Sequence, residues 1–377
     1  MNIIEETLKI KEEVIEFRRN LHKCPETAFH EVMTMEYIRE HLEEWNISYR
    51  LLEPSGILAV VGSGEKTIAL RADMDALEVT EETSLNFSSR NDGYMHACGH
   101  DGHTAILMAV SKILKKYEDE LNRKIFLIFQ PAEETAQGAR NILETGILKN
   151  VDAIFGVHIF SGIEKGKISL EAGPRMASTN WFSIRIEGKS GHAGKPHECV
   201  DTVVAAAALV MNLQTIVSRN INPLEAAVIT LGKVTAGTAR NVVAGEALLE
   251  GTVRTFSKET EEQIAEKIKK MAEATAEMYG TEIFVDYQPS SHPALINDKE
   301  LVATAMKSAK KVFQPEEFVH VPAMMLGEDF ANYLADMKGC FAFIGGGGGY
   351  PNHHGKFDFD EEALIQGVKL MLAFAFV

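Results

Sequence analysis

Apolar residues recur at helical spacing over residues 4–22 and again over 34–45, and both stretches predict helices. Short apolar runs bounded by glycine or by charge then alternate with further helical patterns, as expected of buried strands joined by helices. The predicted elements in this part are strands at 57–62, 67–74, 124–130 and 153–159, and helices at 103–117 and 136–146. Strands that alternate with helices are typical of a layered α/β domain.

A different pattern begins at Trp181. Strand, helix, strand, strand, helix and strand follow one another, and this β-α-β-β-α-β order is that of a ferredoxin-like unit. The predicted elements are strands at 181–188, 226–234, 246–256 and 281–287, and helices at 200–218 and 259–279. A strand at 339–345 and a last helix then resume the first pattern. We therefore predict a lobe of residues 181–292, inserted into a domain made of 1–180 and 293–377.

Composition narrows the class of protein. The length of 377 residues exceeds what one hydrophobic core usually fills, which agrees with two domains. A formal net charge of −16 repels the phosphates of nucleic acids and the head groups of anionic lipids. Neither nucleic acid nor a membrane surface is therefore expected as a partner.

The start of the chain mixes acidic and basic residues and lacks the apolar core of a signal peptide. No stretch holds the roughly 20 apolar residues that span a bilayer. We therefore expect a cytoplasmic protein. The cysteines are too few and too widely spaced for a disulfide framework, so free thiols are expected, with one available as a metal ligand. They are Cys24, Cys98, Cys199 and Cys340.

The densest group of chemically active side chains is the segment MHACGHDGHT, at the start of the predicted helix at 103–117. Four residues within six positions carry thiol, imidazole and carboxylate groups: Cys98, His100, Asp101 and His103. Together these groups bind transition metals such as Zn, Mn, Ni or Co. Histidines at a helix start can instead cap the helix and face solvent, but four ligand-type residues so close together favour a metal site.

Two adjacent glutamates, Glu133 and Glu134, follow the predicted strand at 124–130 in the segment QPAEE. Because neighbouring side chains point in different directions, one carboxylate can bind a metal while the other faces a water molecule held there. The second carboxylate can then take a proton from that water and pass it to a leaving amine, as a hydrolase requires. Taken alone, paired glutamates are more often a solvated surface.

Histidines mark two further segments. His158 lies at the end of the predicted strand at 153–159, where α/β sheets present ligands, although a lone histidine there is more often a core residue. His353 and His354 lie on a loop after a run of five glycines, and glycine lets backbone approach a ligand closely. Two adjacent histidines do not easily point the same way, so we expect one ligand and one bystander.

Six motifs occur in one order along nearly the whole chain: RADMDALEVTEE, HACGHDGHT, QPAEE, GVHIF, GHAGKPH and NHHGKFDF. In this order they resemble the amidohydrolase branch, subfamily D, of the M20 metallopeptidase family. The resemblance implies a zinc-peptidase-like α/β/α catalytic domain with an inserted ferredoxin-like lobe. It also implies a metal-dependent hydrolase of amide C–N bonds, which cleaves small N-acyl-L-amino acids to an amino acid and a carboxylic acid.

The resemblance further assigns roles to single residues. The implied ligands of two divalent ions per subunit, of Mn, Zn, Ni or Co, are Cys98, His100, Glu134, His158 and His353. Cys98 is the implied bridge between the ions, and the family spacing to the next aromatic residue selects His353 over His354. Glu133 becomes the general base. Asp75 falls where related enzymes orient a group of the metal site.

In the predicted lobe, GKSGHAGKPH resembles the family segment whose histidine reaches the active site of the partner subunit. This implies a homodimer formed through the lobe, with His192 as a donor to the oxyanion of the reaction. Asn241 matches a family asparagine that binds the substrate, and Arg254 is a further candidate for substrate binding. The alternative for His192 is an exposed histidine in a glycine-rich turn, and the alternative for Arg254 is a surface ion pair.

Three positions depart from the family pattern. Glu78 and Ala244 stand where proline is common, and Gly355 replaces the usual proline after the implied ligand histidine. These departures bear on substrate preference more than on chemistry. Three other activities stay open: an aminopeptidase or dipeptidase of the same family, a thiol hydrolase that uses Cys98, and a catalytically silent binding protein.

Overall fold

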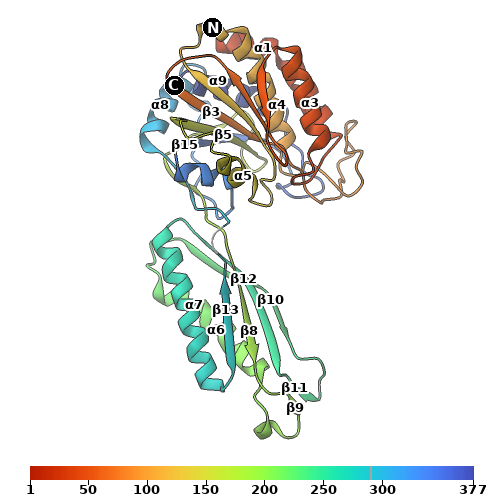
Figure 1. Cartoon of the computed structure of the whole chain (residues 1–377), viewed down its shortest axis with the longest axis vertical. Coiled ribbons are helices and arrows are strands. Elements are labelled where there is room, and N and C mark those ends of the chain that lie inside the picture. Colours follow the sequence, from red (N-terminus) through yellow and green to blue (C-terminus); the bar gives the residue numbers. More distant parts are fainter. Residues whose placement is uncertain (289–290) are drawn as a thin grey trace. The chain divides into compact units, whose positions relative to one another are not determined.

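The chain forms two compact units, which the computed structural model describes over residues 1–288 and 291–377 (Figure 1). Unit 1 consists of Met1–Arg175, Ile296–Pro322 and Asp329–Val377, and unit 2 consists of Met176–Leu295 and Ala323–Glu328. Residues 323–328, which the sequence pattern placed in the first domain, therefore group with unit 2. Residues 289–290 of the predicted lobe lie outside the described part of the chain.

Unit 1 is built on a seven-stranded mixed sheet with the strand order β1-β2-β4-β3-β5-β15-β6. Its strands are β1 (Ser48–Leu51), β2 (Ile57–Val61), β3 (Thr67–Asp73), β4 (Lys124–Gln130), β5 (Ala153–Phe160), β6 (Ile168–Ser169) and β15 (Lys338–Gly345). The central strands β4, β3, β5 and β15 run parallel to one another. Every residue of β3 and β5 is buried, as expected for parallel strands covered on both faces. Their carboxyl ends lie along one edge of the sheet.

Side chains from other elements cover both faces of this sheet. The helices of unit 1 are α1 (Ile3–Lys9), α2 (Lys11–His22), α3 (Val32–Glu44), α4 (His100–Lys116), α5 (Gly138–Glu144), α8 (Lys299–Ala309) and α9 (Glu362–Ala375). On β5, Phe155 stacks on Phe374 of α9, with 4.5 Å between the ring centroids. The next residue, Gly156, faces Phe330 of the 3-10 segment Asp329–Ala335. Because successive strand residues point to opposite faces, the structure confirms the predicted α/β/α layers.

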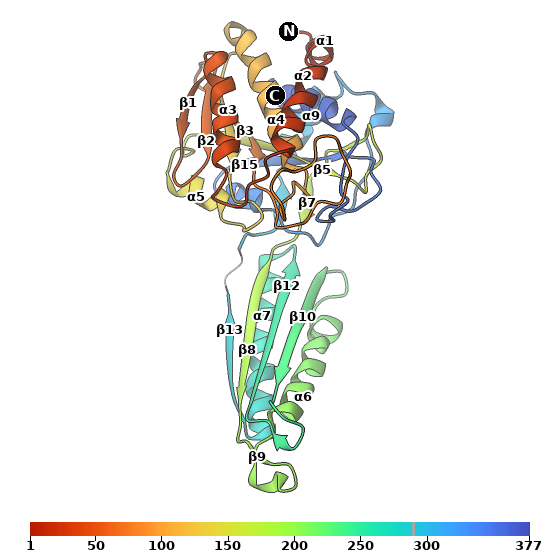
Figure 2. The same cartoon turned by 90° about the vertical axis from the view of Figure 1, so that its right-hand side faces the viewer.

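Unit 2 is a four-stranded antiparallel sheet with two helices (Figure 2). Its main elements in chain order are β8 (Asn180–Glu187), α6 (Thr202–Thr215), β10 (Ala227–Ala236), β12 (Glu246–Thr255), α7 (Lys258–Tyr279) and β13 (Glu282–Tyr287). The strand order is β10-β12-β8-β13. Every second residue of β8 is buried, so the helices cover one face of the sheet only. This is the ferredoxin-like arrangement predicted from the sequence.

Two local features differ from the sequence pattern. The stretch 4–22, predicted as one helix, forms α1 and α2, with a break at Ile10, where φ is −91° and ψ is 1°. The pattern does not predict β1, because its residues are exposed or half-exposed and give no apolar run. Short strands complete the chain: β7 (Gly173–Met176), β9 (Gly191–His192), β11 (Val242–Val243) and β14 (Leu295–Asn297).

Helix α6 and the short π-helix that follows it, Ile216–Asn220, are together long and apolar enough to cross a membrane by length and composition alone. Core helices of soluble proteins can be equally long and apolar, so one such helix is weak evidence for a membrane span. About a third of the segment is buried, and Ala205, Leu209 and Leu213 on its inner side belong to the core of unit 2. The inner side of α6 is therefore part of the hydrophobic core of unit 2.

The close packing around Gly156 provides a test of the layered core. A Cβ atom there would lie 2.7 Å from the ring of Phe341 and 2.9 Å from that of Phe330. Both rings are fully buried, so Gly156→Ala should overpack the core and lower the free energy of unfolding by about 1–3 kcal/mol. Gly162→Ala is the control, since no described atom lies within 4 Å of its added Cβ. Denaturant unfolding compares the two variants, and equal stability would contradict this packing.

Candidate metal centre

The ligand-type residues of unit 1 gather where its parallel strands end. Strand β3 leads into Asp75, and β4 leads into Glu133 and Glu134. Strand β5 carries His158 near its end. Ligand sites of α/β sheets form at this edge, beyond the carboxyl ends of the strands.

Cys98 and His100 flank the start of α4. Gly99 between them is the N-cap and has a φ of +93°, a left-handed conformation that glycine adopts without strain. The thiol of Cys98 and the imidazole of His100 consequently reach the same group of ligand atoms. Both side chains are buried.

Two groups of three ligand atoms share Cys98. Atoms of Cys98, His100 and His158 lie within 4.8 Å of one another, and so do atoms of Cys98, Glu134 and His353. Cys98 Sγ lies 3.5 Å from His158 Nε2. Glu134 Oε1 lies 3.5 Å from His353 Nε2 and 3.8 Å from His100 Nε2. The side chains of both groups are of the types that bind divalent transition metals, and Cys98 belongs to both groups.

The two buried histidines of the first group turn Nε2 toward the other ligand atoms. His100 donates from Nδ1 to the carbonyl oxygen of Asp75, at 2.9 Å, and His158 donates from Nδ1 to that of Ile159, also at 2.9 Å. Metal-binding histidines are commonly held in this way. His100 Nε2 and Glu134 Oε1 are buried and have no hydrogen-bond partner among the described residues. Such orphaned atoms are costly, so the side chains present fit a metal centre.

Burial changes the titration of these side chains. It raises the pKa of Glu134 to about 7, and it raises the pKa of the Cys98 thiol well above its usual value. It lowers the pKa of His158 well below its usual value. Each shift favours the uncharged form. Because a thiol and a carboxyl bind cations as anions, cation binding here would release protons and strengthen as the pH rises.

Asp75 connects the two loops that carry the cluster. Its Oδ1 accepts a hydrogen bond from the N–H of Glu133 at 3.1 Å, and its Oδ2 accepts one from the N–H of Glu134 at 3.0 Å. Oδ1 also lies 3.3 Å from His100 Nδ1. The side chain is buried. One carboxylate thus fixes three residues of the cluster.

His103, a ligand-type residue of the same motif as Cys98, is bound by protein groups instead. Its Nδ1 donates to Asp73 at 2.6 Å, and its Nε2 accepts from the N–H of Ile159 at 2.9 Å. Ligand atoms of Asp73, His100 and His103 also lie within 4.8 Å of one another. Because both ring nitrogens of His103 are already used, this third group is a weaker candidate for a metal.

Asp101 is also bound by protein groups. Its Oδ2 accepts a hydrogen bond from Arg18 Nε at 3.1 Å and lies 2.8 Å from His22 Nδ1. Burial alone would raise the pKa of Asp101, but Arg18 and His22 hold it well below its ordinary value. Against the effect of burial, Asp101 and Glu81 raise the pKa of His22 to about 9. This buried network secures the first turn of α4, directly beside His100.

Only one of the two adjacent histidines, His353, lies at the cluster. Its backbone has a φ of +69°, and its N–H donates to the carbonyl oxygen of Ala97 at 2.7 Å. His354 stacks on Tyr350, with 4.7 Å between the ring centroids. Its Nδ1 accepts from the N–H of Lys356 at 3.0 Å. The two neighbouring side chains thus diverge.

Comparison with known proteins identifies the family. Peptidase family M20/M25/M40 matches residues 69–376. The chain belongs to this family. It is 41% identical to N-acetylcysteine deacetylase of Bacillus subtilis, over 93% of each chain. It is 37% identical to N-acetyldiaminopimelate deacetylase of Listeria monocytogenes, over 96% of this chain and 98% of that protein.

A solved structure of an M20 protein is also similar. It is a dinuclear metal-binding peptidase of this family from Bacillus subtilis, with a TM-score of 0.87 and 37% identity, and the match covers 97% of this chain and 98% of that chain. Together these relatives place the chain in the amidohydrolase branch of the M20 family. It is a hydrolase of amide C–N bonds on a fold that holds metal ions.

In this M20 hydrolase, His192 and Asn241 lie together at one end of unit 2. Strand β9 pairs with β11 so that His192 is opposite Val242, and the N–H of Ala193 donates to the carbonyl oxygen of Asn241 at 3.2 Å. Both His192 and Asn241 are exposed. His192 Nδ1 accepts from the N–H of Gly194 at 3.0 Å, so a neutral ring carries its proton on Nε2.

Arg254 lies at the other end of unit 2. The segment that carries His192 lies near the start of β12, because the N–H of Gly188 donates to the carbonyl oxygen of Gly245, directly before that strand. Arg254 is next to the last residue of the same strand. A strand rises by about 3.3 Å per residue, so the two ends are more than about 20 Å apart. Arg254 donates to Thr179 Oγ1 at 3.0 Å.

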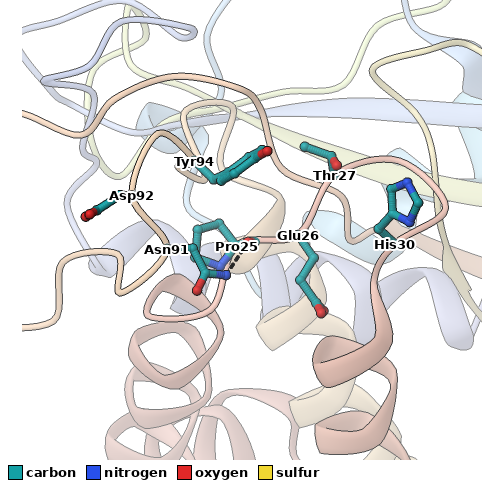
Figure 3. A pocket seen from close by; sticks show the side chains of 7 residues that line it. All are labelled: Pro25, Glu26, Thr27, His30, Asn91, Asp92 and Tyr94. Carbon is teal, nitrogen blue, oxygen red and sulfur yellow. Dashed lines mark hydrogen bonds between the residues drawn. The ribbon is translucent and has the colours of Figure 1, made fainter.

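A pocket of about 470 Å³ opens elsewhere on unit 1 (Figure 3). Its lining residues are Pro25, Glu26, Thr27, His30, Asn91, Asp92 and Tyr94. None of them belongs to the cluster around Cys98. The carboxylate of Glu26 accepts hydrogen bonds from the N–H groups of Met33 and Thr34, and Asn91 Nδ2 donates to the carbonyl oxygen of Pro25 at 2.9 Å. These polar groups serve the local backbone.

Asn352 is a residue of this cluster that the sequence patterns did not predict. Its Nδ2 donates to the carbonyl oxygens of Cys98 at 3.1 Å and of Ile159 at 3.2 Å, and it lies 4.0 Å from Cys98 Sγ. The amide therefore ties the Cys98 loop to the end of β5. Its place directly before His353 in a recognised motif is the signal that could have found it.

Proposed function

We propose that this M20 hydrolase removes the acyl group of small N-acyl-L-amino acids at a centre of two divalent ions. The observation that carries the proposal is the pair of ligand groups that share Cys98, with Glu133 beside them. Relatives named for the deacetylation of N-acetylcysteine and of N-acetyldiaminopimelate support this substrate class. The departures at Glu78 and Ala244 bear on which acyl group or amino acid is preferred.

The residues that we assign as ligands are Cys98, His100, Glu134, His158 and His353. Their thiolate, imidazole and carboxylate groups suit Mn, Zn, Ni or Co. Such ions, when bound, polarise the amide carbonyl and lower the pKa of a water molecule. Asp75 orients His100 and fixes the backbone of Glu134, so it acts through these ligands.

Glu133 is the general base that we assign. Its Oε2 lies 3.9 Å from His100 Nε2, and its Oε1 accepts a hydrogen bond from the N–H of Asp329 at 3.3 Å. It adjoins both ligand groups that share Cys98 but is a member of neither. Its carboxylate can therefore take a proton from the attacking water and pass it to the leaving amine.

A thiol hydrolase at Cys98 has less support. The nucleophile of such an enzyme is the thiolate, and burial raises the pKa of this thiol. A chelator separates the two chemistries, since EDTA abolishes a metal hydrolase reversibly and leaves a thiol hydrolase active.

Replacement of the base tests the mechanism. Glu133→Gln should keep its metal and lose at least about 100-fold in kcat, because the amide cannot accept the proton. Glu134→Gln is the matched control in the adjacent position and should lose metal as well as turnover. Metal content and turnover of N-acetyl, N-benzoyl and dipeptide substrates are measured for both. An active Glu133→Gln variant would overturn the assignment of the base.

The two adjacent histidines offer a second test, of the ligand set. Loss of a residue that only supports a ligand typically weakens metal binding by about 10–100-fold. His353→Ala should weaken metal binding by more than this, because it removes a ligand. His354→Ala should bind metal as the unaltered chain does, because its ring stacks on Tyr350 instead. Competition with a chromophoric chelator measures both affinities. Equal affinities of the two variants would remove His353 from the proposed ligand set.

We propose that the chain forms a homodimer through unit 2. The outer side of α6 exposes Val203, Val204 and Met211, with Met211 69% exposed. Strand β10 lies at an edge of the sheet and exposes Val228 and Val234. An apolar helix face beside an open apolar strand edge favours pairing with a second chain. Burial of both in a dimer would explain why α6 is apolar nearly all round.

We also propose a cytoplasmic location, without a nucleic-acid or membrane partner. The cysteines of the described chain are free thiols, which suits a reducing compartment. The net charge of −16 disfavours anionic polymers and lipid surfaces.

We propose that His192 and Asn241 act in the site of the partner subunit, with His192 Nε2 as the donor to the oxyanion and Asn241 as a substrate ligand. Their exposure at the end of unit 2 supports a role toward another chain. Arg254, at the other end of unit 2, is proposed as a substrate-binding residue. Its partly buried guanidinium supports a role other than a surface ion pair.

Mixed dimers test this sharing of sites. Glu133→Gln and His192→Ala should each be inactive alone. After mixing and subunit exchange, each heterodimer holds one site with both residues intact, so about a quarter of the wild-type rate should return with random pairing. If both residues act within one chain, no activity returns, and the proposal fails.

A further inference from the structure

Glu31, the N-cap residue of α3, is a buried carboxylate that joins two loops of unit 1. The residue has no exposed surface. Its Oε2 accepts a hydrogen bond from Ser55 Oγ at 2.7 Å, and its Oε1 accepts one from the N–H of Ala132 at 3.0 Å. The second contact crosses from the start of α3 to the residue directly before Glu133.

Ala132 has an unusual backbone conformation. Its φ is +55°, in the left-handed region that residues with a Cβ avoid. Its carbonyl oxygen accepts from the N–H groups of Gln137 and Gly138, at 3.2 and 3.1 Å, which closes the loop behind it. A non-glycine residue keeps such a conformation only where its surroundings enforce it.

Two buried carboxylates bind three consecutive N–H groups of this loop. Glu31 takes the N–H of Ala132, and the two oxygens of Asp75 take those of Glu133 and Glu134. The path of the chain into the two glutamates is therefore set by two groups that lie outside the loop. Asp75 also touches His100, whereas Glu31 belongs to none of the ligand groups found among the described residues.

We propose that Glu31 is a positioning residue, which holds Ala132 in its left-handed conformation and so directs Glu133 and Glu134 toward the metal centre. This inference rests on the roles proposed for those two glutamates. Without the carboxylate, Ala132 relaxes toward a right-handed or extended conformation, and the side chains that follow it change direction. Glu31 acts through the loop and touches no reacting group.

Glu31→Ala tests the proposal together with a conservative variant. Glu31→Ala should lower metal affinity by about 10–100-fold, as is typical for groups that support a ligand. It should also lower kcat at least about 10-fold with a smaller change in KM, because positioning of the base affects the chemical step. Glu31→Gln should stay within about 3-fold of the unaltered chain, since its amide oxygen still accepts from Ala132 and its NH₂ donates to Ser55.

Glycine at position 132 supplies the decisive control. Glycine adopts a positive φ without strain, so Ala132→Gly added to Glu31→Ala should restore most of the lost metal affinity and kcat. Ser55→Ala removes the other partner of the same carboxylate and should have a much smaller effect on both. If Glu31→Ala does not fold, Glu31→Asp replaces it, because the shorter arm cannot reach both partners.

Three outcomes overturn the proposal: unchanged affinity and kcat in a folded Glu31→Ala or Glu31→Asp, no recovery with Ala132→Gly, or an equal loss in Ser55→Ala. Metal affinity is measured without substrate and reports on Glu134 even if the unaltered chain cleaves no amide. An inactive unaltered chain would thus refute the proposed function, whereas an active one with an unaffected Glu31→Ala variant would refute this inference alone.

Discussion

The carboxylate of Asp75 is the constraint on which the rest of the site depends. It lies just beyond β3 and binds the N–H groups of Glu133 and Glu134 beyond β4, while it also contacts His100 at the start of α4. Three segments that are distant in sequence therefore meet at one side chain. Parallel pairing of β3 with β4 makes this meeting possible, because it brings both strand ends to the same edge of the sheet.

Other ligand-type residues of the centre are also held by hydrogen bonds with buried polar groups. Asn352 binds the Cys98 loop and the end of β5, and the carbonyl oxygen of Ile159 orients His158. Buried polar groups of this kind are costly unless they are hydrogen-bonded, and here both have specific partners. The ligand atoms of these side chains therefore lie close to one another.

The sequence predicts the layers of the fold because its apolar runs and helical patterns are local, but it does not predict β1, whose exposed residues give no such run. The motif around Cys98 predicts a metal site in a segment where the structure does bring ligand-type side chains together. Residue type alone does not separate His100 from His103, and only the family resemblance selects His100. In the structure the difference depends on Asp73 and Ile159, which other strands supply. No sequence pattern predicts the role of Glu31, since its partner Ala132 lies 101 positions away and contributes only a backbone N–H.

We propose a centre of two ions that share the thiolate of Cys98. A crystal structure of the chain loaded with Mn or Zn, with anomalous scattering measured at the edge of that metal, shows whether it forms. We expect two peaks about 3.5–4 Å apart with Cys98 Sγ bound to both, one beside His100 and His158 and the other beside Glu134 and His353. A single ion, or two ions of which neither contacts Cys98, would rule out the shared thiolate.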